Sequence, residues 1–409
     1  VRKREDLARI IKNAFYIART GKPGPVVVDI PKDIQLAMGS DEYPSEVNIR
    51  GYKPSEGVHV GQIKRALAEL KNAKKPVFLC GGGVNIAHAR KEMQQLAEKT
   101  GIPVVTTIMG KGAIPTDHPL YVGNIGMHGN LASNKAIMES DVLFSIGCRF
   151  NDRITGTIDT FAKNAKIIHV DIDAASISRN IKVDIPIVAD AKVAISKMLE
   201  YAEPLDIKDW VDDIMNVKAE YPINMNRYDG VTPEAIIRTI NDMYSNLIIT
   251  TDVGQNQLWT TQYIDIDENK QLLTSGGLGT MGYGFPAAIG AKLGILNNGY
   301  LGNVRQWQEL FFNKRYSSTC LRYRRRCNRD CQNPDKCCPK YSPDFVKLAE
   351  SYDAKGIRVT KPEEIRPAFE AAKANTNGPT VIEFFIDPTA NVFPMVPGGK
   401  SLNDMILDC

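Results

Sequence analysis

Short apolar runs alternate with helix-like segments along almost the whole chain. Residues 4–20 carry apolar side chains at helical spacing, which predicts an amphipathic helix. The apolar run at 26–30 follows "GKPGP" and predicts a buried strand that Pro31 ends. Alternation of this kind is typical of α/β layers built on parallel sheets.

A second unit is predicted between residues 58 and 202. Its strand-like runs have helical crossovers between them, which predicts a doubly wound parallel sheet that binds ligands at the carboxyl ends of its strands. The five predicted strands are "PVFLC", "IPVVTTI", "VLFSIG", "KIIHVDID" and "IPIVAD", and the predicted helices span 60–73, 87–100 and 191–202.

Polar, proline-containing stretches divide the chain. Residues 36–57 and 203–230 are predicted connectors, the second with a helix around Trp210. We therefore expect residues 1–35 to be the tail of another domain and 231–409 to form a third α/β domain. Its predicted helices are 233–245, 342–352 and 361–374, and its predicted strands are "LIITTDVG", "GIRVT" and "TVIEFFID".

One junction in the third domain breaks the pattern. In "AAIGAKLGILNNGYLG" the first half predicts a helix that stops at Gly294, while Ile295 and Leu296 predict a strand tip before the turn 297–299. Parallel neighbours need a crossover of about a dozen residues, and none is present here. We therefore expect that a central strand and its helix are missing at 294/295, which exposes apolar surface and unpaired strand edges.

Candidate chemistry gathers where strands end. Gly81, Gly82 and Gly83 follow "VFLC" and let backbone N–H groups approach a diphosphate, although a tight turn without a ligand fits equally well. "GCRFNDR" is either a solvated ion-pair loop or a clamp on a phosphorylated cofactor, and "HVDID" places carboxylates where a ribose or ribityl hydroxyl would bind. Together these strand ends favour a bound dinucleotide.

The third domain has its own glycine-rich strand ends, "TDVGQNQLW" and "TSGGLGTMGYG". They permit close approach of an anion at a helix N-terminus. Asn297 and Asn298 offer carbonyl oxygens that suit Mg²⁺, although adjacent asparagines are usually a turn.

The composition excludes several classes of protein. The 409 residues are 43% hydrophobic and 24% charged, with a net charge of +4, which gives no reason to expect nucleic acid as a partner. No apolar run approaches the length of a membrane span, and no secretory signal is present, so we expect a cytoplasmic protein. Because the chain starts at Val1 within a helical pattern, we expect a fragment edge there.

A cysteine cluster marks residues 320–340 as an insert. Four of its thiolates could bind Zn²⁺, but their spacing is not that of ordinary zinc modules, and a reduced or disulfide-tied surface loop is the favoured interpretation. The cluster consists of Cys320, Cys327, Cys331, Cys337 and Cys338.

Several motifs, in order along the chain, resemble the large catalytic subunit of acetohydroxyacid synthase, also called acetolactate synthase. This family uses thiamine diphosphate and Mg²⁺, carries FAD, and joins pyruvate to a second 2-keto acid with loss of CO₂. The motifs are "GKPGPVVVDIPKDIQ", "GIPVVTT", "GCRFNDRITG", "HVDID", "TDVGQNQLW", "TSGGLGTMGYGFPAAIGA", "LNNGYLGNVRQWQELFF" and "VFPMVPGG".

The resemblance implies domains and site residues. Residues 1–35 would end the pyrimidine-binding domain, 58–202 would bind FAD, and 231–409 would bind the diphosphate and Mg²⁺. Residues on the FAD side would be Lys22, Gly81, Gly82, Gly83, Thr106, Met127, His128, Gly147, Arg149, Asp152, Arg153, Asp171 and Asp190. Thiamine diphosphate would contact Gln255, Asn256, Gly279 and Met281; Mg²⁺ would contact Asn298 and Tyr300; Trp307 and Lys32 would be catalytic, Trp307 shaping the pocket for the second keto acid.

The chain also departs from the family pattern. The metal-binding aspartate of the family's Gly-Asp-Gly segment and the glutamate that activates the aminopyrimidine have no counterpart; Asn303 replaces a methionine, and Lys22 an arginine. We therefore expect this chain by itself not to be a competent catalyst. An intact relative would be a homo-oligomer, often with a small regulatory subunit.

Other functions stay open at this stage. The chain would serve as a non-catalytic flavin-binding or subunit-interaction remnant if turnover is lost. Another thiamine-diphosphate enzyme, such as a pyruvate oxidase or a glyoxylate carboligase, is less favoured because of "VRQWQ". The glycine-rich turns do not fit a NAD-dependent oxidoreductase.

Overall fold

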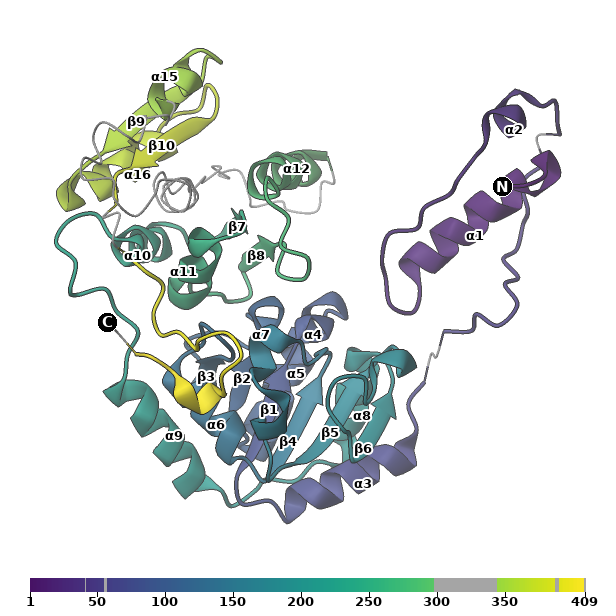
Figure 1. Cartoon of the computed structure of the whole chain (residues 1–409), viewed down its shortest axis with the longest axis horizontal. Helices are drawn as coiled ribbons and strands as arrows, with labels where there is room; N and C mark the ends of the chain where they lie inside the picture. Colours follow the sequence, from purple (N-terminus) through teal and green to yellow (C-terminus); the bar gives the residue numbers. More distant parts are fainter. Residues whose placement is uncertain (41, 55–56, 298–343, 387–389, 408–409) are drawn as a thin grey trace, which may run out of the picture.

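The computed structural model describes residues 1–409 except 41, 55–56, 298–343, 387–389 and 408–409. An N-terminal segment precedes a domain with a six-stranded sheet, and a third part contains two short sheets (Figure 1). The fold is therefore α/β with parallel sheets, as the sequence predicts.

The N-terminal segment contains α1 (Leu7–Arg19), which follows a 3₁₀ turn at Arg4–Asp6, and the short α2 (Lys32–Leu36). The helix predicted at 4–20 is confirmed. The strand predicted at 26–30 is wrong, because no strand forms there and Val27 is 93% exposed. A strand needs a neighbour for its backbone N–H and C=O groups, and within the described residues none lies beside this run.

The central sheet is entirely parallel, in the order β3-β2-β1-β4-β5-β6. The five predicted strands are confirmed, but β3 escaped prediction because it is only four residues long and contains Gly123. The strand order reverses between β1 and β4, the place where doubly wound sheets bind ligands. The strands are β1 (Pro76–Cys80), β2 (Val104–Thr106), β3 (Tyr121–Asn124), β4 (Val142–Ile146), β5 (Lys166–Asp171) and β6 (Ile185–Val188).

Helices cover this sheet. One group, α3, α5 and α8, packs together, and α6 packs against α9 (Figure 1). The helix predicted at 87–100 begins later, and the short α4 precedes it. The bounds are α3 (Val60–Lys71), α4 (Gly82–Ile86), α5 (Arg90–Thr100), α6 (Leu131–Glu139), α7 (Asp152–Thr155), α8 (Ala191–Tyr201) and α9 (Lys208–Glu220).

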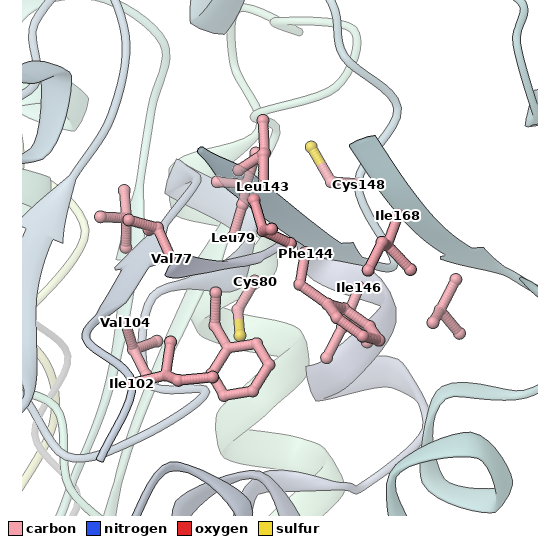
Figure 2. Close-up of a cluster of buried hydrophobic side chains, with 14 of the residues drawn as sticks. Val77, Leu79, Cys80, Ile102, Val104, Leu143, Phe144, Ile146, Cys148 and Ile168 are labelled. Atoms are coloured by element: carbon pink, nitrogen blue, oxygen red, sulfur yellow. The ribbon is translucent and has the colours of Figure 1, made fainter. Parts of the chain in front are cut away.

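The middle of the sheet is a dry apolar core. Every residue of β1 and β4 is buried, as expected for parallel strands with both faces covered. Phe78 and Phe144 meet edge to face, with ring centroids 5.6 Å apart. Figure 2 shows Phe144 among aliphatic side chains of the neighbouring strands.

The third part has a separate core around Ile240, Trp259 and Phe369. Its described strands form two separate parallel pairs, β7 with β8 and β9 with β10. The elements are α10 (Pro233–Met243), β7 (Leu247–Thr251), α11 (Gln255–Tyr263), β8 (Lys270–Thr274), α12 (Gly284–Asn297), α15 (Phe345–Glu350), β9 (Lys355–Val359), α16 (Ile365–Lys373) and β10 (Thr380–Phe384).

Helix α12 runs through the junction at 294/295. The predicted stop at Gly294 and the strand tip at Ile295 and Leu296 are therefore wrong, because the backbone stays helical to Asn297. One glycine costs a helix only about 1 kcal/mol, and no turn separates it from the apolar residues that follow. The rest of the predicted turn, at 298–299, lies outside the described residues.

Helix α12 and the loop before it expose large apolar side chains. Phe285, Ile289 and Leu293, four residues apart on one helix face, are 50%, 41% and 53% exposed. In the loop, Leu278 is 90% exposed and Met281 77% exposed. The exposed apolar surface expected at this junction is thus present among the described residues.

The C-terminal segment returns to the central domain. Val396 and Leu402 belong to the central core, and the Val396 N–H donates to the Met127 carbonyl at 2.7 Å. The Thr157 N–H donates to the Lys400 carbonyl at 3.1 Å. This yellow segment in Figure 1 therefore ties the end of the chain to the loop after β3 and to the loop beyond α7.

Replacing Phe144 by alanine should lower the free energy of unfolding of the central domain by about 3–5 kcal/mol, because a fully buried ring leaves a cavity. Chemical denaturation followed by circular dichroism measures the change. Phe15→Ala is the matched control: Phe15 is 66% exposed in α1, and its loss should cost less than about 1 kcal/mol. Equal losses in the two variants would contradict the assignment of the core.

Candidate functional site

A cavity of about 510 Å³ lies at the carboxyl ends of the central strands. Its walls come from the turns after β1, β4, β5 and β6, from the N-terminal segment around Lys22, and from Gly276 and Gly277 of the third part. The predicted residues that line it are Lys22, Gly81, Gly82, Gly83, Gly147, Arg149, Arg153, Asp171 and Asp190.

The turns after β1 and β4 touch backbone to backbone. The Gly81 N–H donates to Ile146 at 2.9 Å, and the Gly83 N–H donates to the Gly147 carbonyl at 3.1 Å. A Cβ on Gly81 would lie 2.1 Å from the Gly147 oxygen, and one on Gly147, at φ +62°, would lie 2.5 Å from the Gly83 Cα. Packing alone thus requires glycine at these three positions, and two of the N–H groups expected to face a diphosphate are already bonded within the protein.

The two predicted carboxylates at the ends of β5 and β6 hold their own loops. Asp171 accepts the Asp173 N–H at 2.9 Å. Asp190 is the N-cap of α8 and accepts the N–H groups of Lys192 and Val193. Both residues line the smaller cavity, and a carboxylate can accept more than these hydrogen bonds, so hydroxyl binding is compatible with these roles.

Lys22 joins the N-terminal segment to the central domain. Its Nζ lies 3.0 Å from the Asp173 carboxylate and 3.2 Å from the Ser176 hydroxyl. The hydrogen bond from Lys22 holds the pKa of Asp173 below its usual value. The cation predicted to face FAD is therefore fixed at the wall of the cavity.

A larger cavity, about 790 Å³, continues from the first one toward the third part. The two share several lining residues, Arg149 and Gly276 among them. The predicted residues Met127, His128, Arg149, Asp152, Arg153 and Gly279 line it. Burial lowers the pKa of His128, which therefore offers a neutral ring at pH 7.

In the third part, Asp252 organises the glycine-rich loop. Its carboxylate accepts the N–H groups of Val253, Gly282 and Gly284 at 2.9, 3.0 and 3.0 Å. Gly279 in that loop has φ +77°, a conformation that favours glycine. Residues 275–279 of this loop line the larger cavity.

The residues predicted to hold thiamine diphosphate flank this loop. Gln255 and Asn256 open α11, directly after β7. Asn256 Oδ1 is buried and has no hydrogen-bond partner among the described residues, but neither Gln255 nor Asn256 lines either cavity. Met281 is largely exposed instead of packed.

Some predicted residues lie elsewhere. Lys32 is an exposed residue of α2 and lines neither cavity. Thr106 is fully buried and bonds Tyr121 at 3.3 Å, while the next residue, Thr107, lines the smaller cavity. Asn298, Tyr300 and Trp307, with the cysteine cluster and Asn303, lie outside the described residues.

No three His, Cys, Asp or Glu side chains gather as a metal site in the parts of the chain that the structure describes. Three other residues shape the site and were not predicted: Asp252, His169 and Asn180. Asp252 stands within a quoted motif, but nothing in the spacing indicates that its carboxylate binds backbone.

Two protein-family models match this chain. Residues 63–198 match the model described as "Thiamine pyrophosphate enzyme, central domain". Residues 252–295 and 293–384 match "Thiamine pyrophosphate enzyme, C-terminal TPP binding domain". The sheet, its strand-end cavity and the glycine-rich loop are thus those of a thiamine-diphosphate enzyme.

Individual relatives identify the family of thiamine-diphosphate enzymes to which the chain belongs. The acetolactate synthase large subunit of Corynebacterium glutamicum is 40% identical over 443 aligned positions, which cover 98% of this chain and 68% of the relative. The probable acetolactate synthase large subunit of Methanococcus aeolicus is 40% identical (99% and 74% covered), and the Haemophilus influenzae large subunit is 36% identical (100% and 76%). The chain belongs to the acetolactate synthase large-subunit family, which confirms the resemblance.

The matches also bear on the junction at 294/295. The C-terminal model is matched in two pieces that meet at residues 293–295. The alignment with the Corynebacterium relative runs over 443 positions, more than the 409 residues of this chain, so that relative contains residues with no counterpart here. The split match coincides with the junction. The longer alignment shows that the relative has additional residues within the aligned region.

Gly147→Ala should destabilise the central domain by more than about 2 kcal/mol, because it adds both left-handed strain and a clash with Gly83. Gly101→Ala is the matched control: its φ is +75°, but nothing lies within 4 Å of its added Cβ, so only strain of about 1 kcal/mol applies. Thermal unfolding measures both. A smaller loss for Gly147→Ala than for Gly101→Ala would contradict the close contact of the turns.

The Lys22–Asp173 pair predicts a pH dependence. Because the pKa of Asp173 is lowered in the folded state, the pair stabilises above the carboxyl's ordinary pKa, and this contribution is lost as the pH falls through the lowered value. Lys22→Met should return the Asp173 pKa toward its usual range, whereas Lys22→Arg should keep it low. Carboxyl NMR titration measures the pKa; an unchanged pKa in Lys22→Met would refute the contact.

Proposed function

We propose that this chain derives from, and carries the substrate and cofactor sites of, an enzyme that condenses pyruvate with a second 2-keto acid to 2-acetolactate or 2-aceto-2-hydroxybutyrate. The observation that carries the proposal is the 40% identity to an acetolactate synthase large subunit over 98% of the chain. Bound thiamine diphosphate would supply the electron sink for this chemistry. The protein's own part is to hold the cofactors and exclude water.

FAD fits the smaller cavity and its extension. A dinucleotide needs a long groove at the switch point of a doubly wound sheet, and the two connected cavities of about 510 and 790 Å³ start there. Arg149 and Arg153 line both cavities and supply positive charge for a diphosphate. Asp171 and Asp190 supply acceptors for hydroxyl groups.

Thiamine diphosphate is proposed to bind at the glycine-rich loop, where Gly279 lines the larger cavity. Gln255 and Asn256 line neither cavity and lie at the start of α11, shortly after Asp252 in the chain. The buried acceptor of Asn256 and the loop backbone held by Asp252 support this assignment. Mg²⁺ fits less well, because the family's metal-binding aspartate has no counterpart in the sequence. The roles of Asn298, Tyr300 and Trp307 stay predictions.

The chain in its present form is proposed to bind FAD without catalysing the condensation. The missing crossover removes a metal ligand and leaves the third part with two separate strand pairs in the described residues. A non-catalytic flavin-binding or subunit-interaction module is the second candidate function, favoured by the contrast between this third part and the unbroken central sheet.

Partners and location follow from the family and stay proposals. Small 2-keto acids are the substrates, an intact version forms a homo-oligomer with a small regulatory subunit, and the protein is cytoplasmic. None of the helices in the described ranges is long and apolar enough to cross a membrane.

Purified chain mixed with pyruvate, thiamine diphosphate, Mg²⁺ and FAD should bind FAD but form no acetolactate. Flavin fluorescence measures binding, and a colorimetric acetoin assay measures product. Turnover at a rate normal for an enzyme, about 1–1,000 s⁻¹, would overturn the proposed loss of activity. Absence of FAD binding would overturn the assignment of the central cavity.

A graft tests the cause of the loss. The corresponding segment of the Corynebacterium glutamicum relative, inserted between Gly294 and Ile295, should tighten Mg²⁺-dependent binding of thiamine diphosphate by about tenfold or more, because it restores a carboxylate ligand. The matched control is the same graft with its aspartate replaced by alanine. Equal affinity of the two grafts would show that the carboxylate is not the missing element.

A further inference from the structure

The turn after β4, residues 147–151, is held by side chains that the family resemblance does not assign. Its backbone is strained, since Phe150 has φ +51° although it is not glycine. It also carries Arg149, whose side chain lines both cavities. Such a turn keeps its shape only if its polar groups are fixed by the surroundings.

Two side chains bond the carbonyl groups of this turn. His169 Nε2 lies 2.8 Å from the Cys148 oxygen, and Asn180 Nδ2 lies 3.1 Å from the oxygens of both Arg149 and Phe150. The remaining carbonyl at the start of the turn, that of Gly147, accepts the Gly83 N–H. These contacts fix four successive carbonyls.

His169 is chemically suited to this task. It lies on β5 beside Ser145 of β4, is completely buried, and packs edge to face on Phe150 with centroids 5.1 Å apart. A carbonyl can only accept, so Nε2 must carry the proton. Nδ1 has no partner among the described residues, and burial lowers the pKa of the ring, so the neutral form with Nε2–H is the stable one.

The charged group near the ring, Asp171, does not change the neutral form of His169. Asp171 Oδ2 lies 3.8 Å from Nε2, beyond hydrogen-bond distance, so the Nε2–H donates to the carbonyl of Cys148 and not to Asp171. Asp171 favours the charged ring, but burial outweighs it in setting the direction of the pKa shift. His169 does not line either cavity and therefore acts only through the turn.

We propose that His169 and Asn180 are positioning residues that pre-form the 147–151 turn and thereby aim Arg149 at the diphosphate of a bound flavin dinucleotide. This rests on the proposed FAD site. Losing either donor leaves backbone carbonyls without partners and lets the strained turn relax. Part of the free energy of flavin binding is then used to order the turn, which weakens binding.

FAD affinity of the purified chain tests the proposal. His169→Leu should weaken FAD binding by about tenfold, the effect of an unsatisfied buried carbonyl, whereas His169→Gln keeps an N–H at similar reach and should stay within about threefold of the parent. Asn180→Leu, a substitution of similar size at an exposed position, guards against a folding failure of the buried variant and should weaken binding by about fivefold. Because Asn180, unlike His169, also lines the larger cavity, its positioning role requires in addition faster amide hydrogen exchange of residues 149–151 in this variant without FAD.

Asn72→Leu is the matched control. Asn72 is also exposed and donates to a backbone carbonyl, that of Ala68, but on α3 away from both cavities. Its FAD affinity should be unchanged. The affinity of each variant is measured well below its melting temperature, so that loss of folded protein does not lower it. Recovery of affinity in His169→Gln then distinguishes the lost hydrogen bond from a general loss of stability.

The outcomes separate the two proposals. If the parent chain does not bind FAD, the proposed function fails. The positioning role is then tested by amide hydrogen exchange of Arg149 to Asn151. Faster exchange in His169→Leu than in the parent supports it, and equal exchange refutes it. If the parent binds FAD and folded His169→Leu and Asn180→Leu bind it equally well, the positioning roles are refuted while the flavin site stands.

Discussion

The central domain depends on a contact between two turns that have no room for a Cβ atom. Gly81 and Gly83 after β1 and Gly147 after β4 lie so close that each added methyl would enter the other backbone. This contact joins the neighbouring strands at which the order of the sheet reverses. The glycines of both turns line the smaller cavity, which lies where ligands bind in doubly wound sheets.

The third part has a different sheet arrangement in the described residues. Its core of helices and short strands is buried around Ile240 and Phe369, yet the described strands are paired only two by two. The apolar face of α12 remains exposed at Phe285 and Leu293, on the helix that runs through the junction. A helix can continue through such a junction because its hydrogen bonds are local, whereas a strand needs a partner from elsewhere in the chain.

The sequence predicted most of the central sheet because buried parallel strands are continuous apolar runs. It failed where local pattern and environment disagree: 26–30 has a strand's composition but no neighbour, and β3 has a neighbour but only a short, glycine-containing run. For the site, motifs found the glycine turns and the carboxylates. They could not reveal that Gly81 and Gly83 bond within the protein, or that His169 and Asn180 hold a turn, because those contacts join positions far apart in the sequence.

Binding and catalysis therefore separate along the chain. In the proposed function, flavin is recognised by the unbroken central sheet and the turns at its edge, and the residues assigned to it above are all described. In the same proposal, condensation of keto acids depends on a metal ligand in the third part. The deletion proposed at 294/295 would change the third part and leave the central domain intact, since the two cores are distinct. This separation follows from topology, because helix α12, which contains the junction, belongs to the third part.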